Sequence, residues 1–386
     1  MRNVLLTAFK MYKSCLNRPK TRWAGVVILA GLFLFSCKTS KKVTVTKDMK
    51  TRLDNLLATV PDFSGVLLVA DQGKIVYHKA WGYRSFETKE SMDTASVFEL
   101  ASVSKQFTAL TIMQMKEAGK LSFDDPIDKY LPGLPYTGVT IRHLLTHTSG
   151  LPDYQEIMDK YWNKTKVAGN TDNIAYLIQY HPPRLFEPGE KYAYSNTGYM
   201  LLASITEKVS GQDFITFCRT RFFGPAQMTQ TDIRTVAEKK QLPNLAAGHI
   251  YVKEKQQYVP ADSFPQFNYA IWLGNRKGPG RVSSTSADLL KWDRILYSGK
   301  IVKPETLLEA FSPTRLNDDS LSWYGFGWKI RQSKKGKVVW HNGDNPGYAT
   351  QFERYIDADK TIILLSNNAH PKIPDILQSV EAIVEE

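Results

Sequence analysis

The sequence has few cysteines and lacks repeated long apolar runs, and both shortages restrict what it can be. Only 3 cysteines occur in 386 residues, which excludes the disulfide-rich scaffolds of small secreted proteins. A multi-span membrane protein would need repeated runs of roughly 20 apolar residues, which are absent. With 42% hydrophobic and 23% charged residues, the chain is neither disordered nor collagen-like. A globular protein remains, long enough for two domains.

Acidic residues are absent from the first 36 positions, which carry six basic residues. Thirteen uncharged residues follow at 23–35, and a basic start before a short apolar run is typical of a secretion signal. The run ends in Leu34-Phe35-Ser36-Cys37, which resembles a bacterial lipobox. We therefore expect 1–36 to be a lipoprotein signal peptide and Cys37 to carry a lipid, which would hold the exported chain on the periplasmic side of a membrane in the bacterial cell envelope. An ordinary signal peptide and an uncleaved anchor are the alternatives.

The positive charge is concentrated near the N-terminus. Residues 37–52 hold six basic residues and one acidic residue and are typical of a solvated tether. Residues 53–386 hold 38 basic and 37 acidic residues, a net charge of +1. The overall +12 therefore belongs to export and tethering, and nothing predicts a nucleic acid as partner. Because Cys218 is the one cysteine after Cys37, no internal disulfide is expected.

Apolar runs predict strands at both ends of the body. The predicted strands lie at 65–70, 74–82, 324–331, 337–343, 348–356 and 360–366. Apolar residues at helical spacing predict a first helix that stops at Pro61, a last helix over 376–384 and a mostly helical middle. We therefore predict an α/β (α+β) fold with a mostly antiparallel sheet built from 53–96 and 283–386 and flanked by helices. An all-helical domain over 97–282 would be inserted in it.

Ser102 and Lys105 begin an apolar helix that is predicted to end at Gly119. One helical turn brings the Lys105 amine within reach of the Ser102 hydroxyl. The unpaired N–H groups of a helix start favour negative charge on a bound oxygen, as one half of an oxyanion hole would. A catalytic serine is one interpretation of Ser102, and a plain helix cap is the other.

Two further motifs carry polar groups suited to a cleft. Tyr194 and Asn196 follow a Pro-Gly turn, where the phenol could move protons and the amide could hold substrate; a packed Tyr and a turn Asn are the alternative. His341 and Gly343 end a predicted strand, and a glycine there lets a substrate backbone lie close. The N–H of Asp344 could complete the oxyanion hole, although a strand histidine is often only packed or solvated.

Taken in this order, the motifs SxxK, YxN and HxG resemble those of the serine β-lactamase and penicillin-binding-protein family, whose class A members carry SxxK, SDN and KTG. The chain is most similar to the class C-like branch. Agreement extends to 141–154, 186–205, 280–292 and 340–350, so the resemblance runs from about residue 53 to the end. It implies a sheet flanked by helices, a helical domain beside it, and a site between them.

The resemblance implies a serine hydrolase that works through an acyl-enzyme. Ser102 would attack a carbonyl, with either Lys105 at a lowered pKa or Tyr194 as its base. Asn196 would hold a substrate amide or orient Lys105, and the N–H groups of Ser102 and Asp344 would accept the oxyanion. We expect no cofactor, and no group of side chains has the spacing of metal ligands.

The histidine of the third motif affects which substrates the sequence predicts. With a reference pKa of about 6.5, His341 would be mostly neutral at pH 7 and would hold a carboxylate less firmly than the lysine of KTG. We expect a peptidase of D-amino-acid or peptidoglycan peptides first, an esterase of small acyl esters second and a weak β-lactamase third. A catalytically silent lipoprotein that binds cell-wall fragments is the alternative from another class. His147, in the HTSGL segment, is predicted only to brace a turn.

Overall fold

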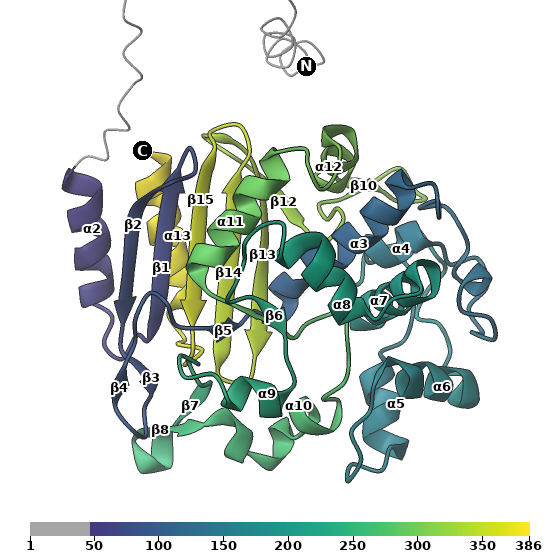
Figure 1. The fold of residues 1–386 in the computed structure, drawn as a ribbon, viewed down its shortest axis with the longest axis horizontal. Helices are drawn as coiled ribbons and strands as arrows, with labels where there is room; N and C mark the ends of the chain where they lie inside the picture. The colour runs from purple at the N-terminus through teal and green to yellow at the C-terminus, as the bar shows by residue number, and fades with distance from the viewer. Residues whose placement is uncertain (1–46) are drawn as a thin grey trace, which may run out of the picture. The chain divides into compact units, whose positions relative to one another are not determined.

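The computed structural model describes residues 47–386 (Figure 1). The predicted signal peptide, Cys37 and residues 37–46 of the predicted tether lie outside the described residues. Helix α2 (Lys47–Ala58) begins inside the segment 37–52, so the end of that segment is helical. Among the described helices, none has the length and apolar character needed to span a membrane.

Six strands form the main sheet in the order β12-β13-β14-β15-β1-β2, and every neighbouring pair is antiparallel. They are β1 (Gly65–Asp71), β2 (Lys74–Trp81), β12 (Lys329–Ser333), β13 (Gly336–Asn345), β14 (Tyr348–Tyr355) and β15 (Lys360–Ser366). The register of β1 on β15 runs from Gly65 opposite Ser366 to Asp71 opposite Lys360. The two chain ends therefore complete one sheet, which confirms the predicted mixed fold with an antiparallel sheet.

Helices cover both faces of the sheet (Figure 1). Helix α11 (Ser286–Tyr297) packs over β1 and β15, while α13 (Ile373–Glu385) lies on the opposite face and packs against α2. Because both faces are covered, the sequences of β1 and β15 are almost continuously apolar rather than alternating.

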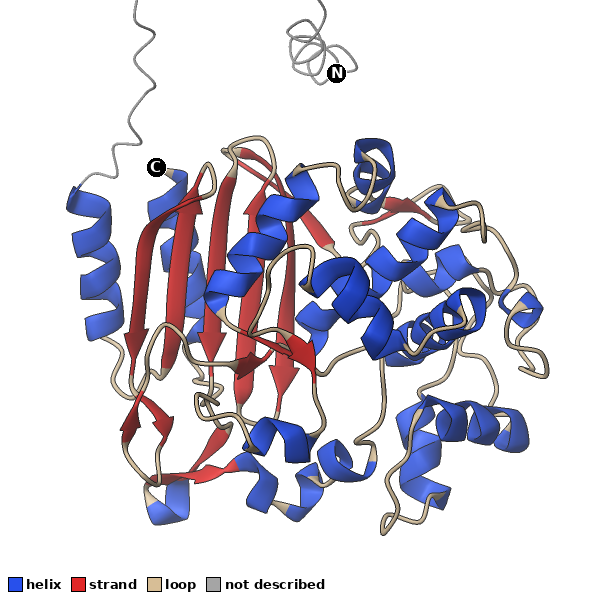
Figure 2. Cartoon of the chain, viewed as in Figure 1, coloured by secondary structure: helices blue, strands red, loops and turns tan. Residues whose placement is uncertain are grey.

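The chain between these strands supplies most of the remaining helices (Figure 2). They are α3 (Lys105–Glu117), α4 (Ile141–Leu145), α5 (Tyr154–Tyr161), α6 (Asn170–Tyr180), α7 (Asn196–Ser210), α8 (Phe214–Cys218), α9 (Val236–Lys240), α10 (Tyr269–Trp272) and α12 (Pro304–Ala310). Helix α3 packs against α7.

Short strands also occur, in the middle segment and at its borders. They are β3 (Tyr83–Ser85), β4 (Glu90–Ser91), β5 (Phe98–Glu99), β6 (Asp232–Ile233), β7 (His249–Val252), β8 (Gln257–Pro260), β9 (Val282–Ser284), β10 (Thr314–Arg315) and β11 (Leu321–Ser322). Because β5 to β8 lie within 97–282, the prediction that this segment is all-helical is wrong. The domain boundaries at 97 and 282 stay a prediction.

The strand predicted over 324–331 is wrong in its first half, because β12 begins only at Lys329. Gly327 has a φ of 80°, which is outside the extended region of a strand. A Cβ at Gly327 would lie 2.9 Å from the carbonyl oxygen of Lys105. The backbone therefore turns here to pack against the start of α3.

A buried ion pair joins the sheet to α11. Arg354 on β14 and Asp293 on α11 are both 0% exposed, and Arg354 Nε donates to Asp293 Oδ1 at 2.5 Å. The Arg354 guanidinium also lies 4.5 Å from the ring centre of Tyr297. Removal of one member of such a pair leaves a buried charge without compensation.

We expect Asp293→Asn to lower the free energy of unfolding by about 3–5 kcal/mol, since it strands the Arg354 charge. Urea unfolding followed by circular dichroism measures this. Asp319→Asn is the matched control, because its pair with Arg315 is exposed at the surface and should contribute little. Equal unfolding midpoints for the two variants would contradict a stabilising role for the buried pair.

Candidate active site

Ser102 lies on a tight turn rather than on the α-helix itself. A 3₁₀ turn, η1 (Ala101–Ser104), precedes α3, and Ala101 has a φ of 48°, which is strained for a residue with a side chain. Hydrogen bonds from both sides hold the turn: Leu100 N donates to Val282 O at 2.8 Å and Thr350 Oγ1 donates to Leu100 O at 2.9 Å. The turn presents Ser102 partly exposed.

Lys105 is 0% exposed and its amine uses all three hydrogen-bond positions. Nζ lies 3.2 Å from Ser102 Oγ, 2.9 Å from Asn196 Oδ1 and 2.8 Å from Pro279 O. Burial, and then the positive charge of Arg276, hold the pKa of Lys105 well below its ordinary value. A neutral Lys105 can therefore accept the proton of Ser102.

Tyr194 lies over the Lys105 amine, with its ring centre 4.7 Å from Nζ. The residue is 40% exposed, yet its phenol end is enclosed, and this burial raises the pKa while a hydrogen bond with Ser102 opposes the rise. The phenol therefore stays protonated at neutral pH. Of the two groups predicted as alternative bases, Lys105 suits the base and Tyr194 suits a proton donor.

His147 braces the loop that carries Tyr194 and Asn196, as predicted. Its Nδ1 accepts from Ser195 N at 3.0 Å, and its carbonyl accepts from Ala193 N at 2.9 Å. Ser195 in turn caps α7 by accepting from Gly198 N. Asn196 is consequently held as the first residue of α7 with its amide facing Lys105.

His341 is buried, and both of its ring nitrogens have partners. Nε2 lies 2.9 Å from Tyr324 Oη and Nδ1 lies 2.6 Å from Asn342 O. Burial, with the charge of Lys105, lowers the pKa of His341 to about 3, so the ring is neutral at pH 7. The ring thus links Tyr324 to the backbone of β13, and the substrate contact predicted for His341 stays a prediction.

Gly343 brings β13 against the nucleophile turn. A Cβ at this position would lie 2.1 Å from Leu100 O, 2.5 Å from Thr350 Oγ1 and 3.1 Å from Ser102 N. Only glycine fits such an approach. Asp344 follows with an exposed side chain that accepts a hydrogen bond from Asn342 Nδ2. Ser102 and β13 are therefore in close contact. An oxyanion hole formed by the N–H groups of Ser102 and Asp344 would require this contact.

Sequence reasoning missed Tyr324 and Arg276. Tyr324 is 1% exposed and lies in the segment predicted as a strand. Arg276 lies in a loop with no motif, and its influence on Lys105 depends on tertiary proximity alone. Residues 47–386 contain no cluster of His, Cys, Asp or Glu that could hold a metal ion.

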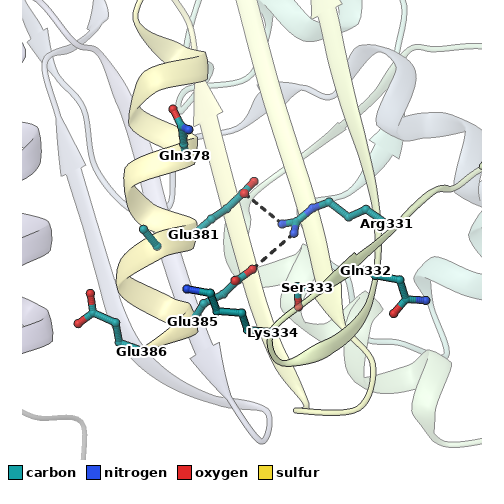
Figure 3. Close-up of a pocket in the computed structure, with 9 residues that line it drawn as sticks. Arg331, Gln332, Ser333, Lys334, Gln378, Glu381, Glu385 and Glu386 are labelled. Carbon is teal, nitrogen blue, oxygen red and sulfur yellow. Dashed lines mark hydrogen bonds and ion pairs between the residues drawn. The ribbon is translucent and has the colours of Figure 1, made fainter.

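A cavity of about 690 Å³ lies away from this cluster, between the end of β12 and α13 (Figure 3). Arg331 in its wall pairs with Glu381 and Glu385 at 3.2 and 3.5 Å. The cavity contains none of the motif residues, so the site is defined by the Ser102 cluster.

Comparisons with known proteins identify the family of this chain. Residues 53–381 match the family model described as beta-lactamase. Penicillin-binding protein 4* of Bacillus subtilis (strain 168) is 42% identical over 327 residues, which cover 83% of this chain and 72% of that protein. The octameric penicillin-binding protein homologue from Pyrococcus abyssi has a TM-score of 0.73 at 26% identity, covering 87% of this chain and 76% of that one.

The D-amino acid amidase from Ochrobactrum anthropi SV3 shares the fold, with a TM-score of 0.71 at 22% identity, covering 87% of this chain and 96% of that chain. With a family match over 53–381 and a relative at 42% identity, the chain belongs to the β-lactamase family of serine hydrolases and penicillin-binding proteins.

Proposed function

We propose that this chain forms an acyl-enzyme on Ser102 and hydrolyses peptides that contain D-amino acids, peptidoglycan peptides among them. The observation that carries the proposal is the buried Lys105 amine, 3.2 Å from Ser102 Oγ and with a pKa well below its ordinary value. An amine that is neutral at the working pH activates a serine hydroxyl. A protein that only bound cell-wall fragments would have no use for this arrangement.

The proposed reaction has two halves. Lys105 takes the Ser102 proton while Oγ attacks the substrate carbonyl, and the N–H groups of Ser102 and Asp344 accept the oxyanion. Tyr194 donates a proton to the leaving amine and is reprotonated from Lys105, which leaves the acyl group on Ser102. Water then attacks the acyl carbonyl, and the acid departs as Ser102 regains its proton.

The substrate class follows from two lines of support. The relative at 42% identity is named for binding penicillin, and penicillins acylate the serine of SxxK enzymes. A peptide ending in D-alanine presents a comparable carbonyl and carboxylate. The neutral, enclosed His341 favours an esterase as the second candidate, because the third motif then offers no cation for a substrate carboxylate.

We expect Ser102→Ala to lower hydrolysis at least about 1,000-fold, because the nucleophile is lost. The full chain in detergent is assayed on a D-Ala-D-Ala peptide, a p-nitrophenyl ester and a chromogenic cephalosporin, and a fluorophosphonate should add mass at Ser102. Ser298→Ala, which removes an exposed hydroxyl, is the control. Cleavage of the ester alone would indicate an esterase, and absence of both hydrolysis and labelling would indicate a silent binder.

The pH dependence of acylation tests the role of Lys105. Since the folded environment lowers the pKa of Lys105, the acylation rate should rise with pH through an apparent pKa well below the ordinary lysine value. Arg276→Gln removes a repulsive charge, so the pKa should rise and the acid limb should move to higher pH. Stopped-flow acylation from pH 5 to 10 measures the limb, with exposed Arg221→Gln as control. An unmoved limb would contradict the coupling.

We also propose that lipid on Cys37 anchors the chain on the periplasmic side of a membrane. The support is the motif of residues 34–37. Cys37→Ser should remove the chain from the membrane fraction or leave its signal peptide uncleaved. Mass spectrometry of the mature N-terminus should find diacylglycerol on the chain with Cys37 and none on the Cys37→Ser variant. A mature N-terminus at any other residue would exclude the lipoprotein.

A further inference from the structure

The three hydrogen-bond partners of the Lys105 amine differ in whether they can donate. Asn196 Oδ1 and Pro279 O are carbonyl oxygens and can only accept, at 2.9 and 2.8 Å from Nζ. Ser102 Oγ, at 3.2 Å, belongs to a hydroxyl that can also donate. A neutral amine has two N–H groups and one lone pair. When the two carbonyl oxygens accept the N–H groups, the lone pair is directed at the Ser102 hydroxyl.

The direction of this lone pair depends on the Pro279 carbonyl. Within residues 47–386, the three contacts above are the hydrogen bonds of Nζ. The other groups that lie near the amine or interact with its charge are Tyr194, Tyr199, His147, His341, Arg276 and Asp153. If the Pro279 carbonyl moved away, one N–H would be released and would turn toward Ser102 Oγ. The lone pair would then point elsewhere, and Lys105 would not be oriented to accept the proton.

Helix α3 holds the segment of Pro279 at two consecutive residues. Thr108, one helical turn beyond Lys105, donates from Oγ1 to Gly278 O at 2.7 Å. Gly278 has a φ of 109°, and its backbone lies against α7, where a Cβ would be 2.2 Å from Tyr199 O. Both helices therefore contact Gly278, and the carbonyl of the next residue faces Lys105.

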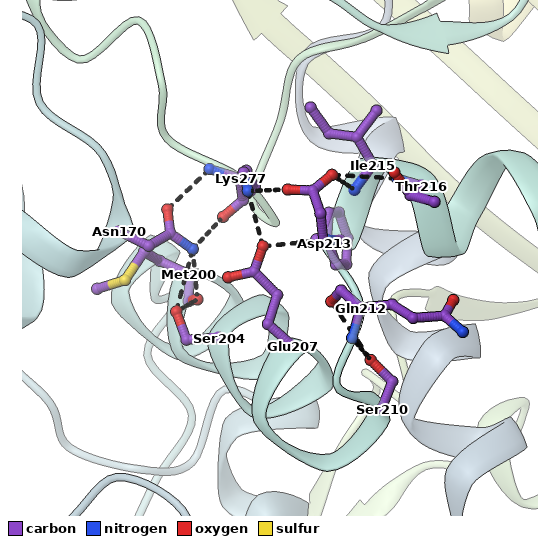
Figure 4. Close-up of polar contacts among 11 residues, drawn as sticks. Asn170, Met200, Ser204, Glu207, Ser210, Gln212, Asp213, Ile215, Thr216 and Lys277 are labelled. Atoms are coloured by element: carbon purple, nitrogen blue, oxygen red, sulfur yellow. Dashed lines mark hydrogen bonds and ion pairs between the residues drawn. The ribbon is translucent and has the colours of Figure 1, made fainter.

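Asn170 on α6 holds Lys277, which lies two residues before Pro279 (Figure 4). Its Oδ1 accepts from Lys277 N at 2.8 Å and its Nδ2 donates to Lys277 O at 3.1 Å. The same Nδ2 lies 3.1 Å from Met200 O and 3.2 Å from Ser204 Oγ on α7. Asn170 is 7% exposed. One buried amide therefore joins α6 and α7 to the segment that carries the Pro279 carbonyl.

The Lys277 side chain adds ion pairs to this network (Figure 4). Its amine pairs with Glu207 on α7 at 2.7 Å and with Asp213, the residue that caps α8, at 2.5 Å. The ion pairs hold the end of the side chain. Asn170 instead holds both main-chain groups of Lys277, and the main chain is what sets the position of the Pro279 carbonyl.

We propose that Asn170 is a positioning residue for the base Lys105 and acts through the Pro279 carbonyl. By fixing the main chain at Lys277, it keeps this carbonyl where it accepts one N–H of the amine, and the lone pair stays directed at Ser102. The proposal rests on the proposed acyl transfer to Ser102. A carbonyl that is held in advance needs no reorganisation when the proton moves.

Asn170→Ala removes both bonds to Lys277 and tests this role. We expect the maximal rate of acylation by a p-nitrophenyl ester to fall about 10- to 100-fold, as the displacement of a positioned group does. The ester concentration that gives half of this rate should change little, because Asn170 does not touch substrate. Stopped-flow measurement on the full chain in detergent gives both values. Asn55→Ala, the same change at an exposed position of α2, is the matched control.

The pH profile distinguishes positioning from a general loss of structure. An ammonium that loses a carbonyl acceptor is less stable relative to the neutral amine, so the pKa of Lys105 should fall. The acid limb should then move to lower pH by about 0.5–1 unit. Arg276 keeps its bond to Tyr154, so its charge still acts on the amine. Partial unfolding would lower the rate without this shift. An unchanged rate, or a lower rate whose limb has not moved to lower pH, overturns the proposal.

Thr108→Val is a second variant, for use if Asn170→Ala does not fold. It removes the donor to Gly278 O and should therefore displace the same segment. The maximal rate should fall and the acid limb should move to lower pH, as for Asn170→Ala. Where this variant alone folds, an unchanged rate or an unmoved limb overturns the proposal.

A direct titration separates this proposal from the proposed function. In the full chain with lysine labelled by carbon-13 at Cε, the NMR signal of Lys105 reports the pKa of the amine without turnover. Its assignment comes from the loss of that signal in Lys105→Arg. Asn170→Ala should lower this pKa, and Asn55→Ala should leave it unchanged.

The titration and the acylation assay together identify which proposal fails. If the unmodified chain hydrolyses no substrate but the pKa falls in Asn170→Ala, the proposed function fails and the positioning role stands. If hydrolysis occurs and neither the pKa nor the rate responds to Asn170→Ala, the positioning role fails alone.

Discussion

The Lys105 amine is the point at which three distant segments meet. It bonds to Ser102 on its own helix start, to Asn196 at the start of α7 and to Pro279 in the loop before β9. An unpaired amine at this depth would be very costly, so the contacts that satisfy Lys105 also fix the positions of the three segments. The same burial that makes the contacts necessary lowers the pKa of the amine. The burial of the Lys105 amine therefore accounts both for the contacts that hold the three segments together and for the lowered pKa of the amine.

The sheet supplies the opposite wall of the site. Because β1 joins the strands of the chain's other end, the nucleophile segment that follows the N-terminal hairpin arrives beside β13. Gly343 then allows contact at a distance that no side chain would permit. His341, bonded to Tyr324 and to the backbone, keeps this strand in register with the segment that turns at Gly327. The substrate contact predicted for His341 stays a prediction.

Burial shifts the pKa values of Lys105 and Tyr194 in opposite directions. Burial acts in opposite directions on an amine and a phenol, so it favours the uncharged form of both Lys105 and Tyr194. Two neighbouring groups whose pKa values move in this way can act as base and acid at one pH. The positive charge of Arg276 adds to the effect of burial on Lys105 and lowers the pKa of the amine further.

The sequence by itself determined the sheet strands, the first and last helices, and the pairing of Ser102 with Lys105, because those patterns depend on neighbours a few residues apart. It also indicated Tyr194, Asn196 and Gly343 through short motifs. It misjudged 324–328, where a contact with α3 overrides strand propensity, and it contained no signal for Arg276 or Tyr324. Only the tertiary structure decided that Lys105 is buried with a lowered pKa, that His341 is neutral and enclosed, and that Arg276 acts electrostatically on Lys105. Burial and charge proximity arise from residues that are far apart in the chain, so no local pattern encodes them.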